Sequence, residues 1–325
     1  MERNLALLVP LHFREAQMGR WQPAGLTEGP VDLSSPLRLG NPVMINVPPA
    51  DEDQAALRLA AAEPGTALCT IVGIDGSYSR RRGAQLAITP DARMAGSLAD
   101  GCLEKELATQ AAEARAAGSG PALLRYGAGS PFIDFRLPCG AGLDVLIDPA
   151  PDRAAMAAAV AELDQRRPAT LPLPAVSPMP ERLFLPTLRL VVLGAGPEPE
   201  ALVRLAATQG LPAELLAPER DLALGRVPDL ALDAWTAVVL LFHDHEWEPA
   251  LADWALRSPA FYVGAQGGRG AREARSERLA AMGHDPASLA RLRSPVGLIP
   301  HARDASTLAL SILAEVVAAY EHLRG

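Results

Sequence analysis

The segment RMAGSLADGCLEKEL, residues 93–107, places a lone thiol where a helix is expected to begin. Small residues let the chain turn, Asp100 or Gly101 can cap a helix, and the leucines that follow repeat with helical spacing. Cys102 is therefore expected in the first helical turn, where unpaired N–H groups and the helix dipole favour thiolate over thiol. Such a group could act as a nucleophile, carry sulfur or bind a metal. The alternative is a half-buried cysteine that packs as a small hydrophobic residue.

Two further segments offer chemistry in the same half of the chain. Cys139 lies in LPCGAG, where Gly140 keeps the surroundings of the thiol open, and two cysteines in similar turns favour one shared site. The loop DGSYSRRRGAQL carries three consecutive arginines that begin at Arg80. Guanidinium groups beside the backbone of Gly83 suit phosphate recognition, with a solvated turn as the alternative.

The segment VVLGAGPEPE resembles the start of a dinucleotide-binding turn after a strand. Gly194 would make the tight turn, and Gly196 would let the backbone approach a pyrophosphate. Pro199 stands where a third glycine is usual, and Glu198 and Glu200 bring negative charge to the position of the phosphates. NAD(P) binding is therefore not expected here, and a glycine turn kept for folding is the other interpretation.

Two later motifs carry histidine and arginine. FHDHE follows an apolar run, so His243 and His245 are expected on the same side of an extended segment at the ligand-binding edge of the sheet. They could ligate a metal, shuttle protons or position a loop, but no third ligand is set by spacing, so no metal site is predicted. Arg269, Arg272 and Arg275 recur at helical spacing, either facing an anion or forming a solvated face.

Bulk properties exclude several classes of protein. The 325 residues have a net charge of −8 and no basic face, which argues against nucleic-acid binding. No apolar run is long enough to span a bilayer and the N-terminus does not resemble a signal peptide, so a cytoplasmic protein without membrane contact is expected. The three cysteines are widely spaced, which argues against a disulfide framework or a structural zinc site.

The pattern of predicted secondary-structure elements changes at a proline-rich segment. The first half reads as one helix, several β-branched strands and the Cys102 helix, followed by an alanine-rich helix over residues 152–167. The second half alternates strand, glycine turn and helix, which is typical of a doubly wound parallel sheet. We therefore predict an α/β protein with an N-terminal mixed α/β domain and a C-terminal Rossmann-like domain. The predicted parts are an N-terminal extension (1–45), a cysteine-containing domain (46–166), a semi-rigid proline-rich linker (167–187) and a Rossmann-like domain (188–325).

Taken together, these segments resemble the XdhC/CoxI family of accessory proteins for molybdenum hydroxylases. GSYSRRRGA is similar to that family's GSxPRxxGA segment, GSLADGCLE to its GxIxGGCxE motif and CGAG to its CGG. VVLGAG, HDHE, YVGAQGGR and PVGL resemble its C-terminal signatures, and the likeness covers roughly residues 65–321. The resemblance implies a protein that binds molybdenum cofactor (molybdopterin), assists its sulfuration with a cysteine desulfurase and delivers it to an enzyme such as xanthine dehydrogenase.

The resemblance also implies roles for single residues. Cys102 with Cys139 would hold sulfur or contact the cofactor, Glu104 would orient or tune the thiol, and Arg80 would face the phosphate. The glycines and the histidine of the matching motifs are further candidates for cofactor binding: Gly83, Gly101, Gly140, Gly194, Gly196 and His243. The departures, among them Asp100 in the GGC pattern and Pro199, fall mostly in the Rossmann-like half. We therefore expect the N-terminal thiol region to keep its role and the Rossmann-like half either to have diverged or to serve mainly for dimerisation and docking. The alternative is a catalytically inert descendant.

The resulting prediction is a cytoplasmic, homodimeric cofactor chaperone rather than a turnover enzyme, with a molybdenum hydroxylase as its client. Two alternatives come from other classes of protein. An NAD(P)-dependent oxidoreductase would use the Rossmann-like half, and a non-catalytic interaction protein would need neither cysteine.

Overall fold

The computed structural model describes residues 52–99, 101–130 and 140–324, without the side chains of Glu52, Asp53 and Cys102. The predicted N-terminal extension lies outside the described residues, as does Cys139. Within the described ranges, no helix has the length and apolarity that crossing a membrane requires.

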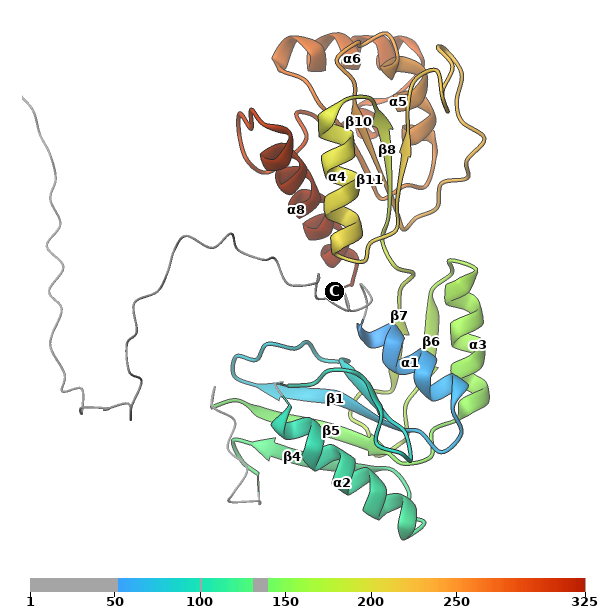
Figure 1. Cartoon of the computed structure of the whole chain (residues 1–325), viewed down its shortest axis with the longest axis vertical. Coiled ribbons are helices and arrows are strands. Elements are labelled where there is room, and N and C mark those ends of the chain that lie inside the picture. The colour runs from blue at the N-terminus through green and yellow to red at the C-terminus, as the bar shows by residue number, and fades with distance from the viewer. Residues whose placement is uncertain (1–51, 100, 131–139, 325) are drawn as a thin grey trace, which may run out of the picture. The chain divides into compact units, whose positions relative to one another are not determined.

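The first half contains a five-stranded antiparallel sheet in the order β3-β2-β1-β5-β4 (Figure 1). Its central strand β1 is nearly all buried, which explains its run of β-branched and aliphatic residues. The strands are β1 (Ala67–Asp75), β2 (Gln85–Ile88), β3 (Met94–Gly96), β4 (Ala122–Gly127) and β5 (Gly142–Asp148).

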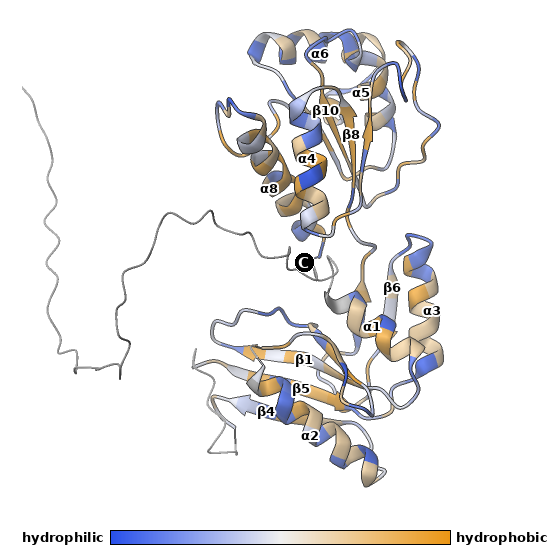
Figure 2. Cartoon of the chain, viewed as in Figure 1, coloured by the Kyte–Doolittle hydropathy of each residue, from blue (hydrophilic) through white to orange (hydrophobic). Residues whose placement is uncertain are grey.

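Helices cover both faces of this sheet, as the alternation along β1 requires. Cys69 and Ile71 point to the face covered by α2 (Cys102–Ala116), whose Leu103 and Leu107 are buried there. Leu68 points to the other face, which α1 (Glu52–Ala62) and α3 (Arg153–Asp164) cover. The apolar stripes of the strands and helices therefore meet in two cores (Figure 2).

Part of the segment predicted as an extended linker is a hairpin. β6 (Ala169–Pro172) pairs antiparallel with β7 (Glu181–Phe184). Leu171 and Phe184 are buried in the core formed with α1 and α3. The prediction of a polyproline spacer was therefore wrong over these strands, because alternate apolar side chains gain more from burial than from staying solvated.

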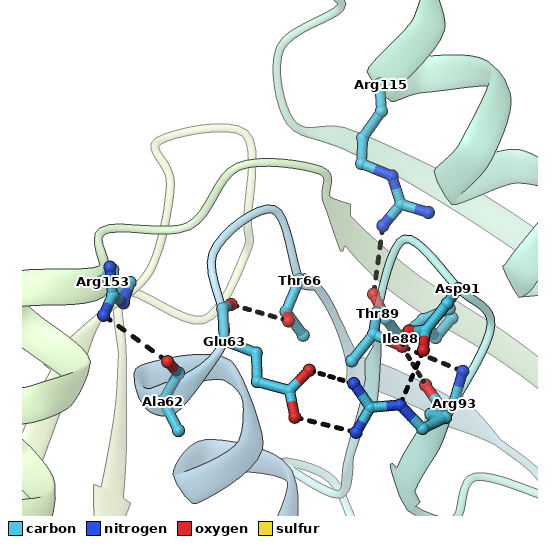
Figure 3. Close-up of polar contacts among 9 residues, drawn as sticks. All are labelled: Ala62, Glu63, Thr66, Ile88, Thr89, Asp91, Arg93, Arg115 and Arg153. Atoms are coloured by element: carbon cyan, nitrogen blue, oxygen red, sulfur yellow. Dashed lines mark hydrogen bonds and ion pairs between the residues drawn. The ribbon is translucent and has the colours of Figure 1, made fainter.

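The end of this sheet where β1 begins is tied together by arginines (Figure 3). Arg93 donates to Asp91 from Nε at 2.8 Å and to Glu63 from Nη1 at 2.9 Å. Its hydrogen bond is the main reason that the pKa of Asp91 falls to about 2. Arg115, at the end of α2, donates to the carbonyl oxygens of Gly65 and Ile88. These contacts provide hydrogen-bond and ion-pair partners for the turns at this end of the sheet, which does not carry the sequence motifs.

The second half is a parallel sheet in the order β12-β11-β10-β8-β9. β8 and β10 are buried on both faces, as the continuous apolar runs predicted. The strand order reverses at β8, because β9 lies on one side of it and β10 on the other. Parallel sheets commonly bind ligands at such a switch point. The strands are β8 (Arg189–Gly194), β9 (Ala213–Leu216), β10 (Thr236–Leu241), β11 (Tyr262–Ala265) and β12 (Leu292–Arg293).

Two layers of helices cover the parallel sheet. α4 (Pro197–Thr208) and α8 (Ala305–Arg324) pack side by side on one face (Figure 1). α5 (Glu248–Arg257) and α6 (Arg269–Ala281) bury Leu251 and Leu279 on the other face, and the short α7 (Pro286–Ala290) follows. The predicted Rossmann-like, doubly wound α/β fold is confirmed. The elements β3, β9, α7 and β12 were not predicted, because they are too short to show a periodic pattern.

Candidate functional site

The motifs of the first half meet at the end of the sheet where β1 finishes, which we call the motif end. The loop of residues 76–84 lies against the loop that precedes α2. Tyr78 Oη donates to the carbonyl oxygen of Leu98 at 2.7 Å, and Arg80 Nη2 donates to Ser97 Oγ at 3.0 Å. The arginine loop and the cysteine loop are thus held together by direct hydrogen bonds.

Arg80 is only partly satisfied by these contacts. Its Nε is buried and has no hydrogen-bond partner among the described residues. A guanidinium presents its donors in a planar fork, so an unpaired Nε beside a bonded Nη2 suits an anionic oxygen. Arg82, two residues on, is exposed. Arg80 is therefore the arginine of this loop best placed for a phosphate.

Gly83 has contacts that serve the fold. Its N–H donates to the carbonyl oxygen of Ile71 at 2.7 Å, and a Cβ there would lie 2.9 Å from Arg182 Nε. Its φ of +89° also favours glycine. These observations explain the glycine without a ligand, and its predicted role in cofactor binding stays a prediction.

Cys102 is the first residue of α2, as its sequence context predicted. Gly101 is the N-cap with φ of 98°, and the space where its Cβ would lie is open. The backbone thus brings the cysteine to an exposed helix start, where the dipole and free N–H groups favour a thiolate. The side chain of Cys102 and its neighbour Asp100 lie outside the described residues.

Glu104 organises the loop that carries this cysteine. Its Oε1 accepts from the N–H groups of Leu98 and Ala99 at 3.0 and 2.6 Å, and its Oε2 accepts from the N–H of Gly101 at 2.8 Å. The residue is 8% exposed. A carboxylate bound by three backbone donors is a positioning group, so Glu104 holds the turn in which the helix starts.

The CGAG segment reaches the same end of the sheet. Gly142 pairs with Asp75, the last residue of β1, and Ala141 accepts from the N–H of Ala128 at 2.9 Å. Gly140 is exposed, with φ of +72° and open space around it. The residue just before it is Cys139, which lies outside the described residues. The described part of CGAG is therefore at the motif end together with the start of α2.

Arg125 connects the strands at the motif end and was not among the predicted site residues. The guanidinium pairs with Asp75 on β1 and with Asp144 on β5, and Nε donates to the carbonyl oxygen of Ala128. A Cβ on Gly142 would overlap this guanidinium. The sequence did offer a signal for this contact. An arginine lies within an otherwise apolar strand, and two other strands of the same sheet each carry an aspartate.

In the parallel sheet, the glycine turn lies at the switch point. A Cβ on Gly194 would overlap the carbonyl oxygen of Leu241, so this glycine is needed for close packing of β8 and β10. Gly196 is the N-cap of α4 and is exposed. The carboxylate of Glu198 faces it, with Oε2 buried, 3.3 Å from where a Cβ on Gly196 would lie and 3.6 Å from His243 Nε2. An acid therefore lies beside the turn where a pyrophosphate would bind.

The two histidines do not share one side of an extended segment. The chain turns after β10, and His245 Nδ1 lies 3.1 Å from Glu248 Oε1 whereas His243 faces Glu198. That prediction was wrong because the strand ends before the motif. Among the described residues, no group of three or more His, Cys, Asp or Glu side chains is placed to hold a metal ion.

The arginines of α6 do not share one environment either. Arg275 is 4% exposed and pairs with Glu248, which is 2% exposed. Its other donors bind Gln266 O at 2.7 Å and Ser294 Oγ at 2.8 Å. Arg272 is exposed. Neither predicted role, an anion site or a solvated face, describes Arg275. It forms a buried ion pair that joins α6 to α5.

Comparison with known proteins agrees with this geometry. Residues 59–127 match the model of the XdhC and CoxI family, and residues 190–316 match that of the XdhC Rossmann domain. The chain is 33% identical over 295 residues to the molybdenum cofactor insertion chaperone PaoD of Escherichia coli (strain K12), covering 84% of this chain and 90% of that protein.

A solved structure described as a xanthine dehydrogenase (BH1974) from Bacillus halodurans shares the fold. Its TM-score is 0.66 at 19% identity, covering 84% of this chain and 96% of that one. At this identity the likeness concerns the fold alone. From the matched family models and the identity to the chaperone, this chain belongs to the XdhC and CoxI family.

Proposed function

We propose that this chain is an accessory protein that binds molybdenum cofactor as its cargo at the motif end and delivers it to a molybdenum enzyme. The observation that carries the proposal is the pair of hydrogen bonds that join the arginine loop to the cysteine loop, from Tyr78 to Leu98 and from Arg80 to Ser97. The relative named as a molybdenum cofactor insertion chaperone supports the same role.

The donors at the motif end fit such a cargo. Arg80 keeps a buried Nε without a partner among the described residues, which suits a phosphate oxygen. Cys102 begins a helix whose N-terminus favours a thiolate, and thiolate sulfur is a soft ligand that suits a metal centre or the transfer of sulfur. Glu104 has its oxygens on backbone donors, so its proposed role is to position the cysteine loop.

The finer parts of the proposal concern partners and setting. A cysteine desulfurase would supply sulfur for the cofactor, with Cys102 and Cys139 as the thiols that receive or protect it. The client would be a molybdenum hydroxylase of the xanthine dehydrogenase type, and the protein would act as a cytoplasmic homodimer. Family membership and the name of the PaoD relative support this chaperone role over a turnover enzyme.

We propose further that the β8–α4 turn does not serve NAD(P). Glu198 at the second position of α4 would face the pyrophosphate with its own negative charge. A dinucleotide-dependent oxidoreductase is the alternative function, and tight binding of NAD(P) to the wild-type chain would favour it.

The test is binding of molybdenum cofactor to the full chain, measured as fluorescent oxidised pterin after removal of free cofactor. We expect Cys102→Ala to lose most of the bound cofactor and Arg80→Ala to weaken binding about tenfold. Arg82→Ala is the matched control, an exposed arginine of the same loop that should keep wild-type binding. No binding by the wild type, or equal losses from the two arginine variants, would overturn the proposal.

A further inference from the structure

A pocket lies on the face of the antiparallel sheet that α1 and α3 cover. Its lining comes from β1, β5, the start of α3, β6 and the two residues after β6. Asp148, which lines it, is the last residue of β5, whereas the first residue of that strand, Gly142, lies at the motif end. The pocket is therefore at the opposite end of the sheet from the proposed cofactor site.

Most of the lining of this pocket is apolar. Leu68, Leu146 and Met156 are each no more than 3% exposed, and Leu171 of β6 and three prolines add to the walls. The cavity volume of about 100 Å³ is smaller than the roughly 150 Å³ of a cavity that holds benzene. The pocket therefore suits a branched alkyl group.

The charged residues that line the pocket are both acidic, Asp148 and Asp152. Asp152 caps α3 and accepts from the N–H groups of Ala154 and Ala155, so its charge offsets the positive end of that helix. Asp148 is half-buried, and its Oδ1 accepts from the N–H of Ala150 at 3.1 Å. It has no ion pair within the described part of the chain, and burial raises the pKa of its carboxyl. The pocket therefore favours a positively charged group.

Thr70 adds a buried hydroxyl to the lining. The residue is 1% exposed, its Oγ accepts from Gln85 Nε2 at 3.0 Å, and none of the described residues accepts its own hydrogen. An unpaired buried donor is costly, so an acceptor on a ligand would complete its hydrogen bonding. The strand register makes Thr70 of β1 and Asp148 of β5 diagonal neighbours on one face of the sheet, about 7–8 Å apart by the usual spacing. One small ligand can therefore reach both.

We propose that this pocket binds an apolar primary amine that carries a carbonyl group next to its amine-bearing carbon. The ammonium group donates to the Asp148 carboxylate, and the carbonyl oxygen accepts from the hydroxyl of Thr70. The alkyl group lies against the apolar walls. This is the chemistry of a small amino-acid amide and also of the amino end of a peptide.

Calorimetric titration of the full chain with L-leucinamide tests the proposal, because this probe carries the ammonium, the carbonyl and a branched alkyl group. We expect Asp148→Asn to weaken binding about tenfold, since it removes a charged contact and keeps an acceptor for the N–H of Ala150. Thr70→Val should weaken binding about threefold, since it removes one neutral hydrogen bond. Asp164→Asn is the matched control, an exposed carboxylate of α3 outside the pocket, and should change affinity less than about twofold.

Two further ligands test the recognition of the ammonium group and the source of the ligand. N-acetyl-L-leucinamide keeps the carbonyl and the alkyl group without the charge, and it should bind at least about tenfold more weakly than L-leucinamide. The tripeptide amide Leu-Gly-Gly presents the same amino end at the start of a chain. Tighter binding of the tripeptide than of L-leucinamide would assign the pocket to peptide ends, and the reverse order to small amines.

Three results would overturn the proposal. The first is the absence of heat from L-leucinamide and from the tripeptide with the wild-type chain up to about 10 mM, since a built site should bind more tightly than that. The second is an equal loss in Asp164→Asn, which would show that general surface charge attracts the amine. The third is equal affinity for the acetylated probe, which would show that the charge is not recognised. Circular dichroism shows whether each variant is folded, and the comparison of ligands on the wild-type chain needs no variant. A failure here leaves cofactor binding at the motif end untouched, because that assay uses other residues.

Discussion

Two buried glutamates, Glu104 beside the antiparallel sheet and Glu248 beside the parallel sheet, stabilise their surroundings in different ways. Glu104 is held by three backbone N–H groups that lie within six residues of it in the chain. Glu248 is held by the guanidinium of Arg275, 27 residues away on another helix. The first contact network is local and belongs to one loop, whereas the second joins two helices.

This difference decides what each carboxylate stabilises. Glu104 fixes the shape of the turn in which Cys102 begins its helix, so its loss should affect that turn first. Glu248 and Arg275 are both nearly fully buried, so each neutralises a charge that the other would leave in the core. Their loss should affect the folding of the whole parallel sheet.

The largest expected effect is that of Arg275→Met. The substitution leaves Glu248 buried without its cation, which should lower the free energy of unfolding by about 3–5 kcal/mol. Urea unfolding followed by tryptophan fluorescence measures it, because Trp235, Trp247 and Trp254 all lie in this half. Arg272→Met on the same helix is exposed and should cost less than about 0.5 kcal/mol. Similar losses in the two variants would mean that the buried pair has no special weight.

Glu104→Ala should have the next largest effect. It leaves three backbone donors without an acceptor at a site that is 8% exposed, and we expect a loss of about 3 kcal/mol. Glu113→Ala, an exposed glutamate of the same helix, is the matched control. Amide hydrogen exchange should quicken first at Leu98, Ala99 and Gly101. Uniform quickening across the sheet would contradict a local role.

The same contrast explains how much the sequence could predict. The start of α2 at Cys102 followed from residues close in the chain, because a turn, a cap and two leucines act over short range. The buried strands β1, β8 and β10 also followed, since apolar runs report burial directly. Local patterns therefore predicted the central strands of both sheets and the start of α2.

Contacts between distant segments were not predicted. The pairing of Arg275 with Glu248 depends on how α5 and α6 pack, and no spacing in the sequence encodes it. Arg125 likewise meets Asp75 and Asp144 only because β4, β5 and β1 are neighbours in the sheet. The histidines were misassigned for a related reason, since the turn after β10 sends them to different carboxylates.

A double substitution distinguishes the two glutamates further. Replacing both Glu248 and Arg275 by Met removes the uncompensated charge, so the pair of changes should recover about 2 kcal/mol relative to Arg275→Met alone. The same unfolding assay measures it. Among the described residues, Glu104 has only backbone donors, so no second side-chain change should rescue Glu104→Ala in this way. If the losses in free energy of unfolding of Glu248→Met and Arg275→Met simply add up in the double variant, the two side chains are not coupled energetically.

The smallest expected effect concerns Cys69, a buried ionisable group that lacks the compensation found at both glutamates. Burial raises the pKa of its thiol to about 12. The unfolded chain therefore releases this proton above its ordinary pKa of 9.0 while the folded chain retains it, so stability is lost as the pH rises. The free energy of unfolding should fall by about 1.4 kcal/mol near pH 10. Cys69→Ala should abolish this part of the pH dependence. The substitution should leave the start of α2 unchanged. Urea unfolding of both proteins at neutral pH and at that alkaline pH measures the difference. Burial also raises the pKa of Tyr126, which is present in both proteins, so that part of the pH dependence is common to them, whereas the smaller rise that comes from the charge on Cys69 disappears together with the thiol in Cys69→Ala. An equal pH dependence in the two proteins would show that Cys69 ionises as readily in the core as in the unfolded chain.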